Sequence, residues 1–381
     1  MNGIQLPSKQ DGVASLVVFI IAVPLSLGIA LASGGSPAAG LITAILGGII
    51  CGALSGAPLV VSGPAAGLSA FVFQIVQQHG LQGLAIITVI CGLFQLIMGL
   101  TKSGKLFSLI PKPVLEGVLS AIGLIIVLGQ LHVLMGHGVP KSPSVALLTL
   151  GDSLRSAFSS SEFPVAPVLL CGLFGIAIQL LWSRVFPKLK WLPAALPAVV
   201  IVSVISLFWQ MPRVELEPLL PLLEKGASSF FSFAWMDRLL TYLPVGVGLA
   251  VVASAESMLT ARAIDVLGST RPNYKPSDLN RELMAQGTAN ALSGAVGGLP
   301  MTGVMVRAAA NINAGAQTRW STILHGVWIA LFVGLAPFVL ASIPLTALAG
   351  VLILTGIRLL NLPNLRAELR HSMTDGMIWI G

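Results

Sequence analysis

Charged residues are scarce in this chain. Only 9% of its 381 residues are Asp, Glu, Lys or Arg, and 55% are hydrophobic, whereas about 25% of a typical soluble domain is charged. This shortage excludes an ordinary soluble domain and predicts an all-α polytopic membrane protein. The formal net charge of +7 is not gathered into a stripe of basic and aromatic residues, so we expect no nucleic-acid partner.

Cysteines are few and catalytic motifs are missing. The 3 cysteines lie inside apolar runs without a CxxC spacing, which indicates packing residues rather than a metal site. The chain has no P-loop, no HExxH and no Ser/His/Asp pattern, so we expect neither an enzyme nor ATP-driven transport, and no cofactor beyond a coupling ion. Lys9 is the only basic residue before the first apolar run, and no small-residue cleavage site follows the run. We therefore expect no removable signal peptide.

Several polar residues in apolar surroundings have ordinary explanations. His132 and His137 lie five residues apart in a predicted outside loop, 132–163, and make only a weak metal-site pattern. His325 stands alone in an apolar segment and is interpreted as a packing residue. Glu116 falls in the first turn of a predicted helix, where acidic residues are common.

Apolar segments dominate what is present, and we predict them near residues 13–32, 38–55, 62–77, 83–100, 111–131, 164–183, 191–209, 241–261, 283–296, 302–311, 320–340 and 342–360, with another beginning near Met373. A helix needs roughly 20 apolar residues to cross a bilayer, and segments 62–77 and 302–311 are shorter and accompanied by glycine and proline. Each is the third of its series, counted from 13–32 and from 241–261. Short, interrupted segments at matching positions of two halves indicate a transporter binding site.

The segment count predicts two inverted halves. Seven segments precede residue 240, so the second half should also hold seven. Only five and a fragment of a sixth follow. We therefore expect the last one to two helices to be missing from the sequence.

The distribution of lysine and arginine among the loops supports this series of membrane-crossing segments. If the N-terminus is cytoplasmic and every segment changes sides, fifteen of the 21 lysines and arginines fall in inside loops and five in outside loops, with Arg307 left over. This follows the positive-inside rule. If one short segment did not change sides, the alternation would invert after it and the bias would largely vanish.

The two short segments predict an anion site. A broken helix at membrane depth is tolerated where it lines a cavity or is buried in protein, and the N–H groups at its start attract anions. Small or hydroxyl residues at these starts would let an ion approach the backbone, and they are Ser62, Gly63, Ala65, Ala66, Thr302 and Gly303. Tight helix packing is the competing explanation for each of them.

Arg307 is the one basic residue left inside an apolar segment. Its guanidinium stays charged and offers a planar fork of donors to an oxyanion. A structural pairing with Glu256, or a side chain that snorkels to the interface, is the alternative.

Glu256 is the only carboxylate in the apolar stretch 249–260, and Thr260 shares its helix face four residues on. A charge near the bilayer centre costs a few kcal/mol or more unless it is paired, hydrated or protonated. A carboxylate beside a hydroxyl suits Na⁺, and a desolvated carboxylate suits proton carriage. A structural ion pair or a hydrogen-bonded packing residue is the alternative.

Four stretches in order resemble the sulfate permease (SulP) family: 22–30 (AVPLSLGIA), 61–67 (VSGPAAG), 110–117 (IPKPVLEG) and 290–312, which starts with NALSG. The resemblance runs from about residue 10 to the end. It implies seven-plus-seven inverted repeats, divided into a core of about 10–104 and 240–341 and a gate of about 105–239 and 342–381, with elevator-like transport.

The resemblance also implies a site. The family binds its anion between the facing N-termini of the third and tenth helices, which correspond here to 62–66 and to Met301, Thr302, Gly303 and Val304, with Arg307 behind them. The family's acidic position in the eighth helix falls on Glu256, with Thr260 following. Cyanobacterial bicarbonate transporters of the family have Asp there and use Na⁺, whereas Glu resembles proton-coupled members, so both coupling ions stay open.

The first helix departs from the family's common Pro-Gln-Gly-Met-Ala-Tyr pattern, with Leu25 and Ile29 in place of Gln and Tyr. Members with this variant resemble those found with carbonic anhydrase, which favours bicarbonate and makes that enzyme a candidate partner. The regulatory STAS domain of many members is absent from this sequence. The resemblance further implies a homodimer.

The sequence thus predicts a secondary transporter of a small oxyanion, bicarbonate or sulfate, driven by Na⁺ or H⁺ symport in the bacterial inner membrane. The anion would meet Ser62, Gly63, Ala65, Ala66, Met301, Thr302, Gly303, Val304 and Arg307, and the cation, including Na⁺ as a metal ion, would meet Glu256 and Thr260. An anion channel or exchanger and a nucleobase permease of the same architecture are the alternatives.

Overall fold

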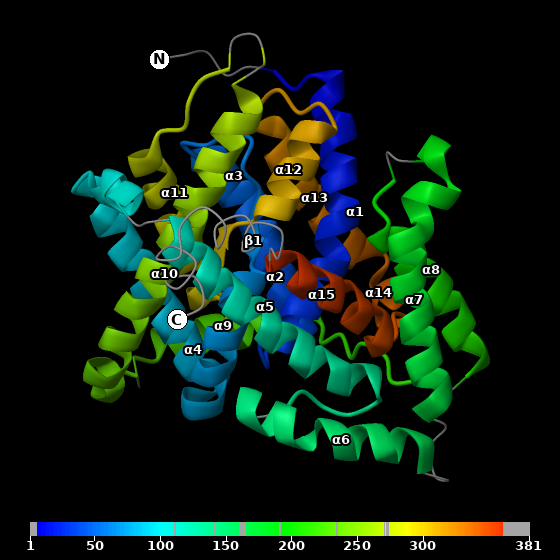
Figure 1. The fold of residues 1–381 in the computed structure, drawn as a ribbon. Helices are drawn as coiled ribbons and strands as arrows, with labels where there is room; N and C mark the ends of the chain where they lie inside the picture. Colours follow the sequence, from blue (N-terminus) through cyan, green and yellow to red (C-terminus); the bar gives the residue numbers. More distant parts are fainter. Residues whose placement is uncertain are drawn as a thin grey trace.

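A computed structural model describes residues 6–360 except 110–111, 141, 160–164, 190–191, 210, 234, 270 and 272–273. Over this range the fold is helical apart from one short ribbon of two strands (Figure 1). The first half contains α1 (Lys9–Ala32), α2 (Pro37–Leu46), α3 (Gly52–Leu54), β1 (Ser62–Pro64), α4 (Ser69–Leu100), α5 (Lys112–Leu134), α6 (Pro143–Ser159), α7 (Val165–Val185), α8 (Ala195–Ile205) and α9 (Leu219–Phe231). The second half contains α10 (Leu239–Gly268), α11 (Leu279–Ala295), β2 (Met301–Gly303), α12 (Met305–Asn313), α13 (Trp320–Leu335), α14 (Pro337–Ala341) and α15 (Leu345–Leu359).

The predicted apolar segments are largely helical in the described range, apart from the strands at 62–64 and 301–303. Residues 69–77 and 83–100 lie on one helical element, yet Gly80 has φ 68° and ψ 179° inside it. That backbone conformation interrupts the helix and is readily adopted only by glycine. The predicted break between the two segments is therefore present at Gly80. The segment predicted near Met373 lies outside the described residues.

The segment predicted as an outside loop, residues 132–163, is partly helical. Residues 132–163 contain α6, which begins at Pro143 directly after Ser142. The Ser142 hydroxyl accepts a hydrogen bond from the backbone N–H of Val145 at 3.2 Å. Serine before a helix and proline in its first position form a helix-start signature, which the overall Ser, Pro and Gly content of the loop concealed.

The two strands pair antiparallel, with Ser62 opposite Gly303, Gly63 opposite Thr302 and Pro64 opposite Met301. The sequence prediction that helices begin at 62 and 302 is therefore wrong by a few residues. A proline disfavours the helical conformation of the residue before it, and Pro64 holds Gly63 extended in this way. The helices start afterwards, at Ala66 in a 3₁₀ turn that leads into α4 and at Met305 in α12.

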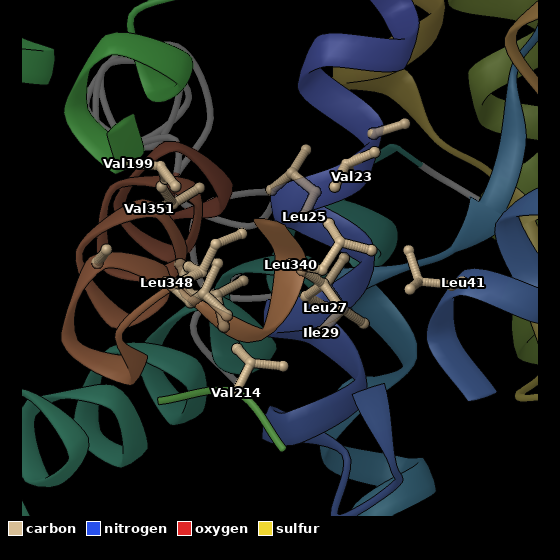
Figure 2. Packing of buried hydrophobic residues seen from close by; sticks show 14 of the residues in the cluster. Val23, Leu25, Leu27, Ile29, Leu41, Val199, Val214, Leu340, Leu348 and Val351 are labelled. Carbon is tan, nitrogen blue, oxygen red and sulfur yellow. The ribbon is translucent and has the colours of Figure 1, made fainter. Parts of the chain in front are cut away.

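The largest hydrophobic cluster joins the two halves of the chain. Figure 2 shows Val23, Leu25 and Leu27 of α1 beside Leu340 of α14, with Leu348 of α15 close by. Elsewhere α11 packs against α4 at glycines: a Cβ added at Gly287 would lie 2.6 Å from the carbonyl oxygen of Gly92. Backbones that approach this closely are typical of membrane helices with small residues at their interface.

Five helical stretches of the described chain are long and apolar enough to cross a membrane: Lys9–Ala32, Pro37–Leu54, Ala66–Leu100, Pro167–Val185 and Met236–Gly268. In Figure 1, α10 and α11 lie on one side of β1, and α7 and α8 lie on the other. The division into core and gate at the predicted boundaries stays a prediction.

Candidate functional site

The β1–β2 ribbon brings two helix starts together. Ala66 begins a 3₁₀ turn directly after β1, and α12 begins at Met305 directly after β2. Neither start has a side-chain cap that accepts a hydrogen bond from its backbone N–H groups. The first N–H groups of a helix have no intrahelical partner and carry its partial positive charge. The arrangement therefore offers two sets of N–H donors to one anion.

The residues predicted to line the anion site are placed along this ribbon. Seven of them are buried, namely Ser62, Gly63, Ala65, Ala66, Met301, Thr302 and Gly303, and Val304 is half-buried. The Ser62 hydroxyl accepts a hydrogen bond from the Gln286 amide at 2.7 Å. It therefore binds α11.

Arg307 is fully buried on α12, behind the ribbon. Its Nη2 donates to the Ser26 hydroxyl at 3.0 Å and to the Pro64 carbonyl oxygen at 3.5 Å, while Nε and Nη1 have no hydrogen-bond partner among the described residues. A Cβ added at Gly63 would overlap Nη1, so the guanidinium lies directly against β1. A buried charge with unused donors is costly unless another group or ion satisfies it.

Glu256 and Arg307 do not neutralise each other. Within the described part of the chain, the Oε2 atom of Glu256 has no hydrogen-bond partner, and the only Arg307 donor with partners, Nη2, binds Ser26 and Pro64. Glu256 instead faces the first helix start, since a Cβ added at Gly67 would lie 2.6 Å from its Oε1. The Thr302 side chain also interacts with this carboxylate. The structural ion pair of these two residues, considered from the sequence, is not formed.

Thr260 binds the backbone of β2. Its hydroxyl donates to the Gly303 carbonyl oxygen at 2.9 Å, and the Gly303 N–H donates to the Ser257 hydroxyl at 3.0 Å. Both hydroxyls come from α10, within four residues of Glu256 on the chain. The candidate cation residues and β2 are therefore in direct contact.

A line of buried polar residues on α11 was missed from the sequence. Glu282, Gln286, Asn290 and Ser293 are each fully buried. Glu282 accepts hydrogen bonds from the Ser55 hydroxyl at 2.5 Å and from the Gln286 amide at 2.8 Å. The sequence does carry a signal, because a spacing of four residues places Glu282, Gln286 and Asn290 on one helix face, across the predicted boundary between the charged connector and the apolar segment 283–296.

The remaining polar residues stay apart from this site. The His132 ring contacts the Thr149 hydroxyl and the His137 ring contacts the Ser156 hydroxyl, so the two rings have different partners. His325 is fully buried, as expected, and its Nε2 has no partner in the described protein. The side chain of Glu116 lies outside the described residues.

Comparison with known proteins identifies the family. The model of the sulfate permease family matches residues 9–381. A proposed sulfate transporter of Bacillus subtilis, YvdB, is 28% identical over 97% of this chain and 68% of its own length. The bicarbonate transporter BicA of Picosynechococcus is 27% identical over 98% of this chain and 65% of its own length. The chain thus spans about two thirds of the length of these curated relatives.

A solved structure has the same fold. The transmembrane domain of a cyanobacterial bicarbonate transporter BicA superposes with a TM-score of 0.85 at 24% sequence identity, covering 98% of this chain and 93% of that domain. The overall structure of SLC26A9 superposes with a TM-score of 0.75 at 18% identity, covering 97% of this chain and 61% of that one. The predicted fold class, an all-helical inverted repeat with two facing half-helices, is confirmed. The chain belongs to the sulfate permease family of multi-pass membrane transporters.

Proposed function

We propose that this chain is a secondary active transporter of a small inorganic oxyanion, bicarbonate or sulfate, driven by symport of Na⁺ or H⁺. One observation carries the proposal: β1 and β2 place two uncapped helix starts together, with the buried Arg307 behind them and beside them the Glu256 carboxylate, whose Oε2 has no hydrogen-bond partner among the described residues. Membrane embedding and an inorganic anion as substrate agree with the family.

The position of Glu256 supplies a physical reason for coupling. Its carboxylate lies against Gly67, at the helix start that would hold the anion. Two negative groups at one helix start repel each other, and this repulsion is strong where water is excluded. A Na⁺ ion or proton on Glu256 removes that repulsion. Each ligand therefore favours the binding of the other, with Thr260 supplying a further oxygen for Na⁺.

The substrate class follows from the donors and from the relatives. Backbone N–H groups and a guanidinium suit an oxyanion. The relatives are named for bicarbonate and for sulfate, and we propose both as candidates for this chain. Elevator-like movement of the predicted core against the predicted gate, a homodimer, a carbonic anhydrase partner and an inner-membrane location with the N-terminus in the cytoplasm belong to the same proposal.

Uptake into proteoliposomes tests this function. Radiolabelled bicarbonate and sulfate are supplied with an inward Na⁺ gradient, with an inward proton gradient, or with neither. We expect concentrative uptake of one anion under one cation gradient. Glu256→Gln should abolish the dependence on the cation gradient while the protein remains folded, because the amide carries no charge to neutralise. The matched control is Glu224→Gln, an exposed position on α9, which should behave like the wild type.

Anion flux that only follows its own gradient, whatever the cation, would establish a channel or exchanger instead. Uptake of nucleobases but not of inorganic anions would establish a nucleobase permease. Normal cation-dependent uptake by Glu256→Gln would remove Glu256 from the mechanism.

A further inference from the structure

The second edge of β2 is covered by side chains. In an antiparallel pair, the backbone groups of successive residues point to opposite edges of a strand. Thr302 is paired with Gly63, and the N–H of Val304 donates to the Val61 carbonyl oxygen at 2.8 Å. Met301 and Gly303 therefore direct their backbone groups to the other edge, where the described part of the chain supplies no strand.

Asn290, Ser257 and Thr260 occupy that edge in place of a strand. The N–H of Met301 donates to Asn290 Oδ1 at 2.7 Å, and Asn290 Nδ2 donates to the Met301 carbonyl oxygen at 3.0 Å. Gly303 is bound in the same two-sided way by Ser257 and Thr260. An amide that pairs with both backbone groups of one residue reproduces the pattern of a neighbouring strand.

The chain of hydrogen bonds continues from Asn290 back to α10. Asn290 Nδ2 donates to Gln95 Oε1 at 2.8 Å, and Gln95 Nε2 donates to the Ser254 hydroxyl at 3.1 Å. Asn290, Gln95 and Ser254 are all 0% exposed. Ser254 lies on α10 two residues before Glu256. The strand that carries the anion site is thus tied to α10 twice, directly at Gly303 and through Gln95 at Met301.

We propose that Asn290, Gln95 and Ser254 are positioning residues that link the cation site on α10 to the anion site on β2. The proposal rests on the proposed function. A buried, hydrogen-bonded polar network has few alternative arrangements, so a shift of α10 on cation binding moves Met301 and the start of α12 with it. Coupling between two sites requires such a shared element, whose position both ligands bias.

The measurement is the ratio of the anion dissociation constant without and with a saturating cation. Radiolabelled sulfate and bicarbonate are bound to the purified full chain in Na⁺ buffer, in choline buffer, and in choline buffer at lower pH. Ser254→Ala removes the last hydrogen bond of the link, and Gln95→Met removes its middle. We expect each variant to lower the ratio by about fivefold or more, while the affinity in choline at the original pH changes by less than about twofold.

A thermodynamic cycle separates the link from simple stabilisation. The double variant should lower the ratio no further than Gln95→Met alone, because both changes cut one path. Ser206→Ala is the matched control, since this buried serine donates only within its own turn, to the Ser203 carbonyl oxygen at 2.7 Å. It should leave the ratio unchanged.

The outcomes are distinguishable. A wild-type protein whose anion affinity no cation alters overturns the proposed function, and the link with it. A wild-type cation effect that survives undiminished in Gln95→Met and in Ser254→Ala overturns the link alone and leaves the transporter proposal standing. If Ser254→Ala does not fold, Gln95→Met, which keeps both bonds between Asn290 and Met301, decides the question.

Discussion

At the scale of single residues, the contact between Arg307 and Gly63 decides how the site is charged. The guanidinium is fully buried, and two of its nitrogens have no hydrogen-bond partner in the part of the chain that the structure describes. Removing a charge from water without pairing it costs several kcal/mol. An anion bound beside Arg307 would offset that cost. Glycine at 63 is what allows the charge to lie against β1, because any Cβ there would overlap Nη1.

Gly63→Ala should weaken anion binding strongly. The added methyl group displaces the guanidinium or separates β1 from β2, at a cost of about 1–3 kcal/mol for overpacking. We expect a loss of roughly tenfold in the affinity for the transported anion, which follows from about 1.4 kcal/mol, measured by radioligand binding to the purified protein. Gly12→Ala is the control, since a Cβ at Gly12 has no atom within 4 Å. Equal affinity in both variants would show that the guanidinium contact is unimportant for the anion.

At the scale of elements, a small number of polar side chains hydrogen-bond to the backbone at helix ends and hold neighbouring elements together. Ser8 caps α1, and the Asp11 carboxylate accepts a hydrogen bond from the Ser8 backbone N–H. The same carboxylate accepts hydrogen bonds from the backbone N–H groups of Gln317 and Thr318 at 2.8 and 2.9 Å, just ahead of α13. One side chain thus joins the first helix of one half to the loop before a helix of the other.

Asp11→Asn should destabilise the protein with little change in substrate preference. The amide keeps one oxygen, so some of these N–H groups lose their acceptor, and each buried loss costs about 1–3 kcal/mol. Thermal unfolding of the detergent-solubilised protein should show a lower midpoint. Asp152→Asn, at an exposed position on α6, should leave the midpoint unchanged. An unaltered midpoint in Asp11→Asn would mean that this junction contributes nothing to stability.

Helices could be predicted from the sequence, and the ribbon could not. Apolar runs of sufficient length indicate membrane helices with little ambiguity, and the glycines and prolines near 62–67 and 297–303 indicated that these two segments are interrupted. A strand of three residues such as Ser62–Pro64 has no periodic pattern of its own, and its pairing with Met301–Gly303 joins residues far apart in the chain. Such contacts are decided by tertiary packing.

The candidate site could be predicted only in part, because its contacts also depend on tertiary packing. Arg307 and Glu256 were conspicuous because charge is rare in apolar surroundings. Their separate partners could not be read from the sequence, since Ser26 and Gly67 lie in other segments. Asn290 and Gln95 are polar residues without charge, and the sequence does not indicate that they bind each other or that Asn290 binds β2.

At the scale of the whole molecule, the charges between the long apolar helices predict an orientation in the membrane. Lys188 follows α7, and Lys225 lies on α9. Both side chains are exposed. The positive-inside rule predicts that Lys188 lies on the cytoplasmic side and Lys225 on the outside.

Cysteine labelling checks this orientation. The native cysteines, Cys51, Cys91 and Cys171, are buried and should react slowly, because thiol reactivity requires access. In intact cells a membrane-impermeant maleimide should label Lys225→Cys, and it should label Lys188→Cys only after the membrane is opened. The wild-type chain gives the background. Labelling of Lys188→Cys in intact cells, with Lys225→Cys protected, would reverse the orientation.

The pairing of β1 with β2 has a consequence for biosynthesis. The ribosome releases β1 long before β2, because α4 to α11 are made between them. During that interval β1 has no partner strand, and Arg307 is not yet present to lie against Gly63. The site is therefore assembled late, and a ribosome that stalls before Met301 leaves a nascent chain whose unpaired strand is open to non-native association.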